Sequence, residues 1–277
     1  MAILGAVAEI LQDYEASLPL TVRQVFYRLV GKYGYEKTEQ AYSRLAEYLN
    51  RARRSGLVAF DAIRDDGVAC HRPDGFDDLA GFWEAVRGAA GVYERDLSQA
   101  HAVHLELWCE AAGMGPQLAA VAHPYGVAVY SASGFDSLTA KYDAAVRMLD
   151  RDKQTVVLHV GDYDPSGVAL YDAVREDVSG LYLDLGGQLI PEFLRVAVTA
   201  EQIDRYDLPG APAKATDRRG SWTGDTVQAE ALSPDELAAE VTAVLDDLAD
   251  IENLVRLRRT GERERVELVQ RLNELTV

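Results

Sequence analysis

Two aspartates spaced two residues apart follow an apolar run near the middle of the chain. Asp162 and Asp164 come after the segment 155–161 and directly before Pro165. Because residues i and i+2 of an extended segment project to the same side, we expect both carboxylates to face one point and bind a divalent metal. Pro165 suits the first turn of a helix, so Asp164 could instead cap that helix. Capping explains one aspartate and leaves Asp162 without a role.

A third carboxylate extends this pair to an acidic triad. Glu110 is the last residue of the apolar segment 103–110, and reactive groups of parallel sheets gather beyond the carboxyl ends of the strands. Three carboxylates suit Mg²⁺, with Mn²⁺ as an alternative. At a phosphodiester, such a metal would neutralise developing charge and orient the attacking or leaving oxygen. Glu110 could also pass a proton to the leaving 3′ oxygen, because neighbouring carboxylates raise its pKa.

The elements that must position the triad alternate between strand and helix patterns. We predict an α/β fold in which residues 101–277 form a mostly parallel sheet flanked by helices, because strands separated by helices imply right-handed crossovers. The predicted strands are 103–110, 127–131, 155–161 and 194–198. The predicted helices begin near 116 and at 165 and cover 137–149, 234–257 and 262–275.

The first 75 residues have a different pattern. Apolar spacing predicts helices near 3–11, at 21–30 and at 39–54, followed by a strand at 56–63 and a turn at Asp65-Asp66-Gly67. Three helices before a hairpin is the order of a winged-helix module, so residues 1–75 are predicted to be winged-helix-like. Residues 76–100 are predicted to form a connecting helix. Its buried side should contain Phe82, Trp83, Val86 and Val92.

Composition limits the class of protein. The chain has 277 residues, of which 48% are hydrophobic, and two cysteines, Cys70 and Cys109. Two cysteines are too few for a disulfide framework or a cysteine-rich zinc site. No run approaches the roughly 18 apolar residues that span a membrane, and no secretion signal is visible. We therefore expect a cytoplasmic protein without a membrane partner, and association with the nucleoid is compatible with this expectation.

The charge distribution bears on nucleic-acid binding. A net charge of −17 opposes it, yet residues 21–60 contain eight basic and three acidic side chains, a local balance of +5. A basic module on an acidic body can bind DNA, although a solvated helix face has the same composition. The candidate DNA contacts are Arg23, Arg28, Lys32, Arg51, Arg53 and Arg54.

The triad and one N-terminal segment together resemble a known family. Glu110, followed later by the sequence Asp-Tyr-Asp-Pro-Ser-Gly at 162–167, resembles the Toprim domain. The form D-x-D-P-x-G is most similar to the A subunit of topoisomerase VI and to the related meiotic double-strand-break proteins. The sequence Thr-Val-Arg-Gln-Val-Phe-Tyr at 21–27 is similar to their segment carrying the DNA-cleaving tyrosine, with Tyr27 at the nucleophile position. Residues 134–139 resemble the family's connecting segment. The resemblance covers about residues 17–170 by motif.

The resemblance implies a mechanism with two protomers. In that family the tyrosine of one protomer attacks double-stranded DNA at the metal site of the other, leaving a 5′-phosphotyrosine and a free 3′ hydroxyl. It implies that Tyr27 is the nucleophile, that Arg23 clamps a phosphate or activates Tyr27, and that the triad holds Mg²⁺. It also implies a homodimer. A separate GHKL-type ATPase subunit is a further implied partner, because this chain has no Gly-rich phosphate loop of its own.

The sequence departs from the family at one position and leaves two other functions open. The family usually has lysine directly after the glutamate, where this chain has Ala111. Candidate substitutes are Lys141, Lys214, Arg218 and Arg219. One alternative function is a Toprim nuclease that uses metal-activated water, with Tyr27 only structural. The other is a non-catalytic DNA-binding subunit that awaits an ATPase partner.

Several other ionisable residues have simpler interpretations. Glu106 lies too far along its strand from Glu110 to share a metal, so we expect a structural or surface carboxylate. His104 and His159 are expected to be hydrogen-bonded core residues. The C-terminal arginines alternate with glutamates, which favours surface ion pairs or a dimer contact over phosphate binding. These arginines are Arg256, Arg258, Arg259, Arg263 and Arg265.

Overall fold

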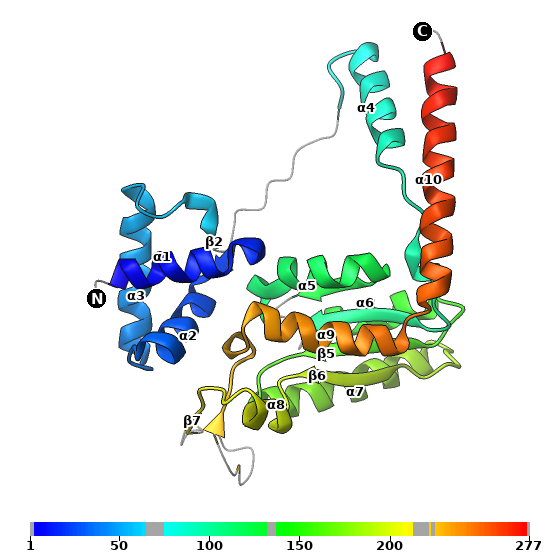
Figure 1. Ribbon diagram of the computed structural model, residues 1–277. Helices are drawn as coiled ribbons and strands as arrows, with labels where there is room; N and C mark the ends of the chain where they lie inside the picture. The colour runs from blue at the N-terminus through cyan, green and yellow to red at the C-terminus, as the bar shows by residue number, and fades with distance from the viewer. Residues whose placement is uncertain (1–2, 65–74, 132–136, 213–221, 223–224, 276–277) are drawn as a thin grey trace.

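The computed structural model describes residues 3–64, 75–131, 137–212, 222 and 225–275 (Figure 1). It has a mixed α/β fold with a four-stranded sheet in which all neighbouring strands run parallel, in the order β4-β3-β5-β6. The predicted α/β class and mostly parallel sheet are therefore confirmed. The strands are β3 (His104–Cys109), β4 (Ala128–Ser131), β5 (Thr155–Val160) and β6 (Glu192–Ala197).

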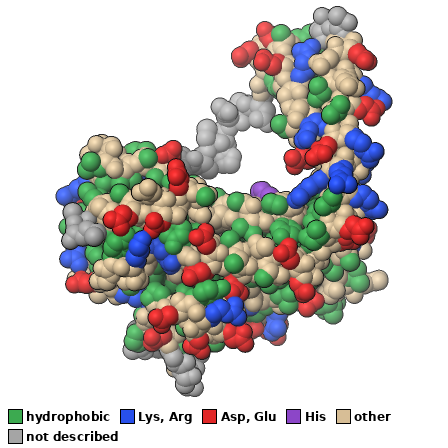
Figure 2. Space-filling model, in the orientation of Figure 1, with side chains coloured by type: hydrophobic (Ala, Val, Ile, Leu, Met, Phe, Trp, Pro, Cys, Tyr) green, Lys and Arg blue, Asp and Glu red, His purple; other side chains and the backbone are tan. Residues whose placement is uncertain are grey.

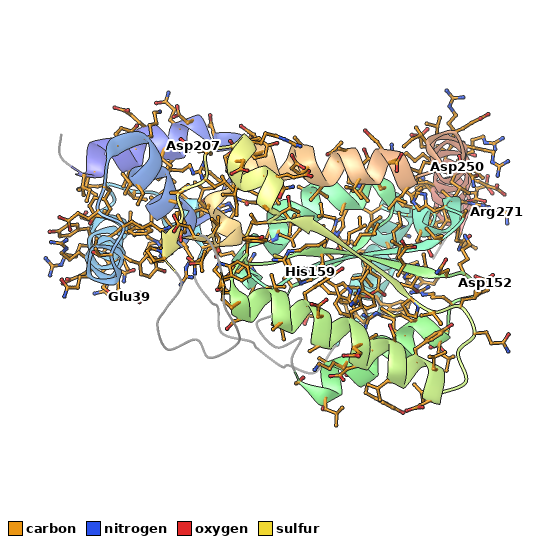
Figure 3. The ribbon with its side chains drawn as sticks, turned by 90° about the horizontal axis from the view of Figure 1, so that it is seen from below. Glu39, Asp152, His159, Asp207, Asp250 and Arg271 are labelled. Atoms are coloured by element: carbon orange, nitrogen blue, oxygen red, sulfur yellow. The ribbon has the colours of Figure 1, made fainter. Side chains whose placement is uncertain are left out.

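Helices cover both faces of this sheet. Every residue of the central strands β3 and β5 is buried, which is typical of parallel strands covered on both sides. Figure 3 shows the layers, with α7 on one side of the sheet and α9 on the other. One face packs against α6 (Leu138–Leu149) and α7 (Pro165–Asp184), and the other against α5 (Gly115–Ala122) and α9 (Pro234–Leu248).

The N-terminal helices join the core on the α5 and α9 face. The three predicted helices are present as α1 (Ile3–Asp13), α2 (Val22–Tyr33) and α3 (Glu39–Arg54). Thr21 and Gln24 form a reciprocal capping box at the start of α2, which satisfies two backbone N–H groups. Gly34 ends α2 with φ 65°, in the left-handed region where glycine is favoured.

The strand predicted at 56–63 is wrong. Residues 60–62 form a 3₁₀ turn, and only β2 (Ile63–Arg64) is extended, pairing parallel with β1 (Leu20–Thr21). Gly56 has φ 74°, and the side chain of Leu57 is 71% exposed. Val58, Ala62 and Ile63 are buried, but the 3₁₀ turn at residues 60–62 interrupts the extended backbone that a strand requires. The predicted turn at 65–67 lies outside the described residues, as does Cys70.

The predicted connecting helix is shorter than expected, and its predicted buried side is wrong for Phe82 and Val92, whereas Trp83 and Val86 are partly buried. Helix α4 covers Leu79–Gly91, and Val92 after it is 75% exposed while Phe82 is also exposed. The reason is that α4 does not lie on the body of the protein. It packs along α10 (Ile251–Glu274), and the two helices project together as an arm (Figure 1).

Helix α10 is continuous where the sequence predicts a break between 257 and 262. Gly261 lies inside it, and a Cβ atom there would stand 3.2 Å from the backbone nitrogen of Arg95. This glycine therefore allows close packing and does not end the helix. The remaining elements are α8 (Ala200–Arg205) and the hairpin of β7 (Ala211–Pro212) and β8 (Asp225–Thr226). Among the described helices, none is both long and apolar enough to cross a membrane.

Candidate functional site

A pocket of about 440 Å³ lies where the N-terminal helices meet the carboxyl end of the sheet. Its walls come from α2, the start of α3, the first turn of α7 and the β7–β8 hairpin. The polar side chains around it include Arg23, Tyr27, Lys37, Glu39, Asp164 and Gln228. The fold thus brings the tyrosine segment and one aspartate of the triad to the same pocket within one chain.

Tyr27 is held as a neutral phenol. Its side chain is buried, with 4% exposed, and its Oη donates a hydrogen bond to Gln228 Oε1 at 2.6 Å. Burial raises the pKa of Tyr27 well above its ordinary value, and the nearby carboxylate of Glu230 raises it further, while Arg23 acts in the opposite direction. Attack by this hydroxyl therefore requires the residue to leave Gln228 and lose its proton.

Arg23 lies one helical turn before Tyr27 and faces an aromatic ring and a carboxylate. Its guanidinium carbon is 5.4 Å from the centre of the Tyr42 ring. Burial alone would lower the pKa of Arg23, but Glu230 and a hydrogen bond to Tyr42 raise it overall. Arg23 therefore remains charged beside the pocket.

Glu230 is a site residue that the sequence analysis missed. It lies in a 3₁₀ turn, Ala229–Ala231, which packs on α2. Burial raises the pKa of Glu230, and the nearby Asp162 raises it further, whereas Arg23 lowers it. A single glutamate far from the motif in sequence, without a spacing pattern, has no local signal that could have identified it.

The two aspartates have different backbone partners. Asp164 caps α7, because its Oδ1 accepts a hydrogen bond from Gly167 N at 2.7 Å. Asp162 Oδ1 accepts from Ala229 N at 2.9 Å. Burial raises the pKa of Asp162, and the nearby Glu110 and Asp164 raise it further, against the effect of the Ala229 bond. The capping interpretation of Asp164 therefore holds, while Asp162 joins the sheet end to the Glu230 turn.

Glu110 directly follows the last residue of β3 and contacts His159 on β5. Its backbone nitrogen donates to Val160 O at 3.1 Å, so it stands beside Gly161. Its Oε1 is 3.1 Å from His159 Nε2, and the ring of His159 is 4.8 Å from that of Tyr171 on α7. Through His159, which lies beside Tyr171, Glu110 is near α7, whereas Asp162 is bonded to the turn Ala229–Ala231.

The donor set can be compared with the needs of Mg²⁺. In the described part of the chain, no three His, Cys, Asp or Glu side chains are close enough to form a ready-made metal site. Mg²⁺ usually takes one or two carboxylates, keeps several waters and binds substrate phosphates. Glu110 Oε1 is buried without a hydrogen bond, and burial, together with the neighbouring carboxylates, raises the pKa of Asp162. These oxygens suit Mg²⁺ chemically, and metal binding by the triad stays a prediction.

A second missed residue, Arg195, carries positive charge close to Glu110 and Asp162. It lies on β6 and donates to the backbone oxygens of Val198, Gly161 and Asp162. Burial lowers its pKa, and Glu110 and Asp162 raise it. Its Nη1 is buried without a hydrogen bond. Arg195 thus fixes the backbone that carries Asp162.

The substitutes suggested for the missing lysine are placed differently. Lys141 is buried on α6, and its Nζ donates to Asp177 Oδ2 on α7 at 2.8 Å. It therefore joins two helices on the side of the sheet away from the pocket. Lys214, Arg218 and Arg219 lie outside the described residues, as do residues 134–136 of the segment resembling the family's connecting segment.

Apart from Arg23, which lines the pocket, the candidate DNA contacts divide into two groups. Arg28 donates to the backbone oxygen of Ala231, and Arg53 donates to Phe60 O at 3.0 Å while its guanidinium lies over the Phe60 ring. Both therefore support the fold. The remaining candidates on these helices lie at the surface and are Lys32 beside Asp13, Arg51 beside Glu47, and Arg54.

Comparisons of the chain with protein-family models, with curated proteins and with solved structures return no match. Function must therefore be inferred from the pocket and its chemistry. The residues that bear most directly on this inference are Arg23, Tyr27 and Asp164, which come from two distant segments and line one pocket.

Proposed function

We propose that this pocket binds a DNA strand and cleaves it in a Mg²⁺-dependent reaction, with Tyr27 as the nucleophile. The observation that carries the proposal is that Tyr27, Arg23 and Asp164 line one pocket. Three N-terminal helices and a D-x-D-P-x-G sequence at the end of a parallel strand support a winged-helix-like module joined to a Toprim-like domain. The proposal includes double-stranded DNA as substrate, a homodimer, and a separate GHKL-type ATPase subunit for any ATP-dependent strand passage.

The chemistry divides among named residues. Mg²⁺ held by the triad of Glu110, Asp162 and Asp164 would neutralise negative charge on the phosphate. Arg23 binds a phosphate oxygen and keeps its charge there. Tyr27 Oη forms a bond to phosphorus while the bond from phosphorus to the 3′ oxygen breaks. The phenol proton is transferred to that leaving 3′ oxygen, so the products are a 5′-phosphotyrosine and a free 3′ hydroxyl.

Activation must begin from the buried state of Tyr27. Its hydroxyl is bound to Gln228, and its pKa is raised by burial. DNA entering the pocket would compete for Arg23 and displace Gln228 from the phenol. The phosphate held by Arg23 would then face the Tyr27 hydroxyl, which no longer bonds to Gln228. Substrate binding would in this way release the nucleophile.

A second candidate function is hydrolysis by a metal-activated water. The burial of Tyr27 and its raised pKa favour this alternative, because a phenol held neutral is a weak nucleophile. The metal would still require Asp162, but Tyr27 would only support the pocket wall. The two candidates differ in whether protein becomes attached to DNA.

The test is to incubate supercoiled DNA with the full chain and Mg²⁺ or Mn²⁺, and to trap covalent protein–DNA species with denaturant. We expect trapping by the wild type, and its loss in Tyr27→Phe and Asp162→Ala. Tyr33→Phe is the matched control, since Tyr33 lies on the same helix outside the pocket and its hydroxyl donates to Glu9. It should trap DNA like the wild type.

Each other outcome selects an alternative. Cleavage that persists in Tyr27→Phe without attached protein, but is lost in Asp162→Ala, indicates hydrolysis by water. DNA binding without cleavage under either metal would favour a non-catalytic DNA-binding subunit.

A further inference from the structure

The lower part of the arm exposes three arginines on one side of α10. Arg256, Arg259 and Arg263 are spaced three and four residues apart, which places them on one helix face. All three are exposed. They line an open hollow along α10 with a volume of about 1200 Å³. We call these residues the α10 arginine face. Figure 2 shows basic side chains gathered on the lower part of the arm.

These arginines lack the carboxylate partners that their alternation with glutamates predicts. Within the described residues, the one ion pair formed inside α10 joins Arg271 and Glu267. Arg256 instead donates to Asn253 Oδ1 at 2.7 Å, and Arg263 to Thr260 Oγ1 at 3.4 Å. The predicted surface ion pairs are therefore wrong for the α10 arginine face.

The carboxylate of Glu264 is already used to attach the arm. Arg95 donates to both of its oxygens, at 2.7 and 2.5 Å, and Tyr93 Oη donates to it at 3.0 Å. These bonds, led by Arg95, lower the pKa of Glu264 to about 2. Residues 255–265 hold five arginines and two glutamates, and Arg95 neutralises one of those glutamates. The segment is thus strongly basic in a chain of net charge −17.

The start of α10 is fixed to the body. Asn253 Nδ2 donates to Ala100 O at 2.7 Å, and the backbone nitrogen of Asp250 donates to His101 Nδ1 at 3.3 Å. Arg258 donates to the backbone oxygen of Pro124. These contacts hold the start of the helix in place, and the three arginines of the α10 arginine face remain exposed.

We propose that the α10 arginine face binds the phosphate backbone of duplex DNA, as a second contact beside the pocket. The choice of DNA as the anion rests on the proposed function. Guanidinium groups pair with phosphate oxygens, and such contacts position DNA without reading its sequence. A second copy of the chain fits this face less well, because a two-fold axis would bring the same arginines together. Asp250, Glu252 and Glu262 line the same surface and weaken its attraction for phosphate. Each arginine–phosphate contact makes the binding sensitive to salt.

The test measures binding of duplex DNA by the full chain in EDTA, at several salt concentrations. The variant Arg256→Gln/Arg259→Gln/Arg263→Gln should bind more weakly, and the slope of log K against log salt should fall by about 2–3, because each phosphate contact contributes about 0.9. The matched control is Arg151→Gln/Arg175→Gln/Arg205→Gln. It removes the same charge from exposed arginines elsewhere and should keep the wild-type slope.

Three results would overturn the inference. They are equal slopes in the wild type and the arginine-face variant, equal losses in the two triple variants, and absence of duplex binding by the intact chain. A dimer that becomes a monomer in light scattering, with an unchanged DNA slope, would assign the face to a second copy instead. Because binding is measured without metal, a failure of cleavage with a normal slope refutes only the proposed function.

Discussion

At the scale of single residues, a fully buried carboxylate lies away from the pocket. Glu106 is fully buried on β3, and Arg147 of α6 donates to both of its oxygens at 2.9 Å. Trp108 Nε1 donates to the same carboxylate at 2.8 Å. Burial alone would raise the pKa of Glu106, but Arg147 and the other donors lower it to about 2. Glu106 is therefore a structural carboxylate, one of the two roles expected from the sequence.

The low pKa of Glu106 predicts loss of stability in acid. A carboxyl group whose folded pKa is below its unfolded value stabilises the fold above the unfolded pKa, and this contribution is lost as pH falls. Because the pKa of Glu106 falls from 4.5 in the unfolded chain to about 2 in the folded protein, acid removes about 3 kcal/mol from the free energy of unfolding. Urea unfolding of Glu106→Gln should show a shallower decline below pH 4.5. At pH 7 its free energy of unfolding should be about 3–5 kcal/mol lower, because Arg147 loses its partner.

The control for this experiment is Glu176→Gln, a change at an exposed glutamate of α7. It should keep both the neutral stability and the acid decline of the wild type. An unchanged acid decline in Glu106→Gln would show that other carboxyl groups govern acid unfolding.

Asp162 should behave in the opposite way, because its folded pKa is raised. Its ionised form opposes folding, so the unfavourable contribution grows as pH rises through the folded pKa. Asp162→Asn retains an oxygen for the bond from Ala229 N and removes the charge. We expect it to increase the free energy of unfolding at pH 7 by about 0.5–2 kcal/mol, as at other charged functional sites. Mg²⁺ should raise the melting temperature of the wild type and not that of Asp162→Asn.

Thermal unfolding with and without Mg²⁺ measures both effects. If Asp162→Asn is less stable than the wild type, the bond from Ala229 N to the charged carboxylate stabilises the fold more than burial and repulsion of that charge destabilise it. Equal Mg²⁺ shifts in the two proteins would remove Asp162 from the proposed metal site.

At the scale of elements, the end of β5 depends on a glycine. A Cβ atom at Gly161 would lie 2.5 Å from His159 Cε1 and 2.7 Å from Glu110 Cδ. Gly161→Ala should therefore displace both side chains and lower the free energy of unfolding by about 1–3 kcal/mol. Gly180→Ala, inside α7 with open space around it, should raise that free energy by about 0.5–1 kcal/mol. Chemical denaturation of the two variants should give shifts of opposite sign.

Local patterns predicted the elements better than their packing. Residues 39–54 form α3 as predicted, because amphipathic spacing follows from the residues of the helix itself. Helix α4 has the composition of a buried helix, yet it lies in the arm, whose attachment depends on Arg95 and Glu264. Contacts between segments 169 residues apart leave no periodic signal in the sequence.

The site was predicted in part for the same reason. Tyr27, Arg23 and Asp164 belong to short motifs, and the structure brings them to one pocket. Glu230 and Arg195 come from a 3₁₀ turn and an adjacent strand, so only the packing of the chain identifies them. The motif also did not indicate that Glu110 contacts His159, because this contact depends on the register of β3 against β5.

At the scale of the whole molecule, the N-terminal helices are joined to the sheet within one chain. Gln24 Nε2 donates to Gln117 Oε1 at 2.6 Å, and Tyr27 and Arg28 donate to the segment 228–231. The hydrophobic core is continuous between the N-terminal helices and one face of the sheet. The resemblance implies a tyrosine acting on the partner's metal site, whereas here Tyr27 and Asp164 of the same chain share a pocket.

This arrangement predicts the result of mixing two inactive proteins. If each chain carries a complete site, co-expressed Tyr27→Phe and Asp164→Ala chains with different tags should form mixed dimers that trap no DNA, because every pocket lacks one residue. If the tyrosine acts on the partner's metal site, half of the sites in a mixed dimer are intact, and trapping should return to about half the wild-type level per dimer. Dimers with one wild-type chain and one chain carrying both substitutions are the control. They keep one complete pocket when the site lies within one chain and none when it is shared, so the two arrangements predict opposite results in the two mixtures.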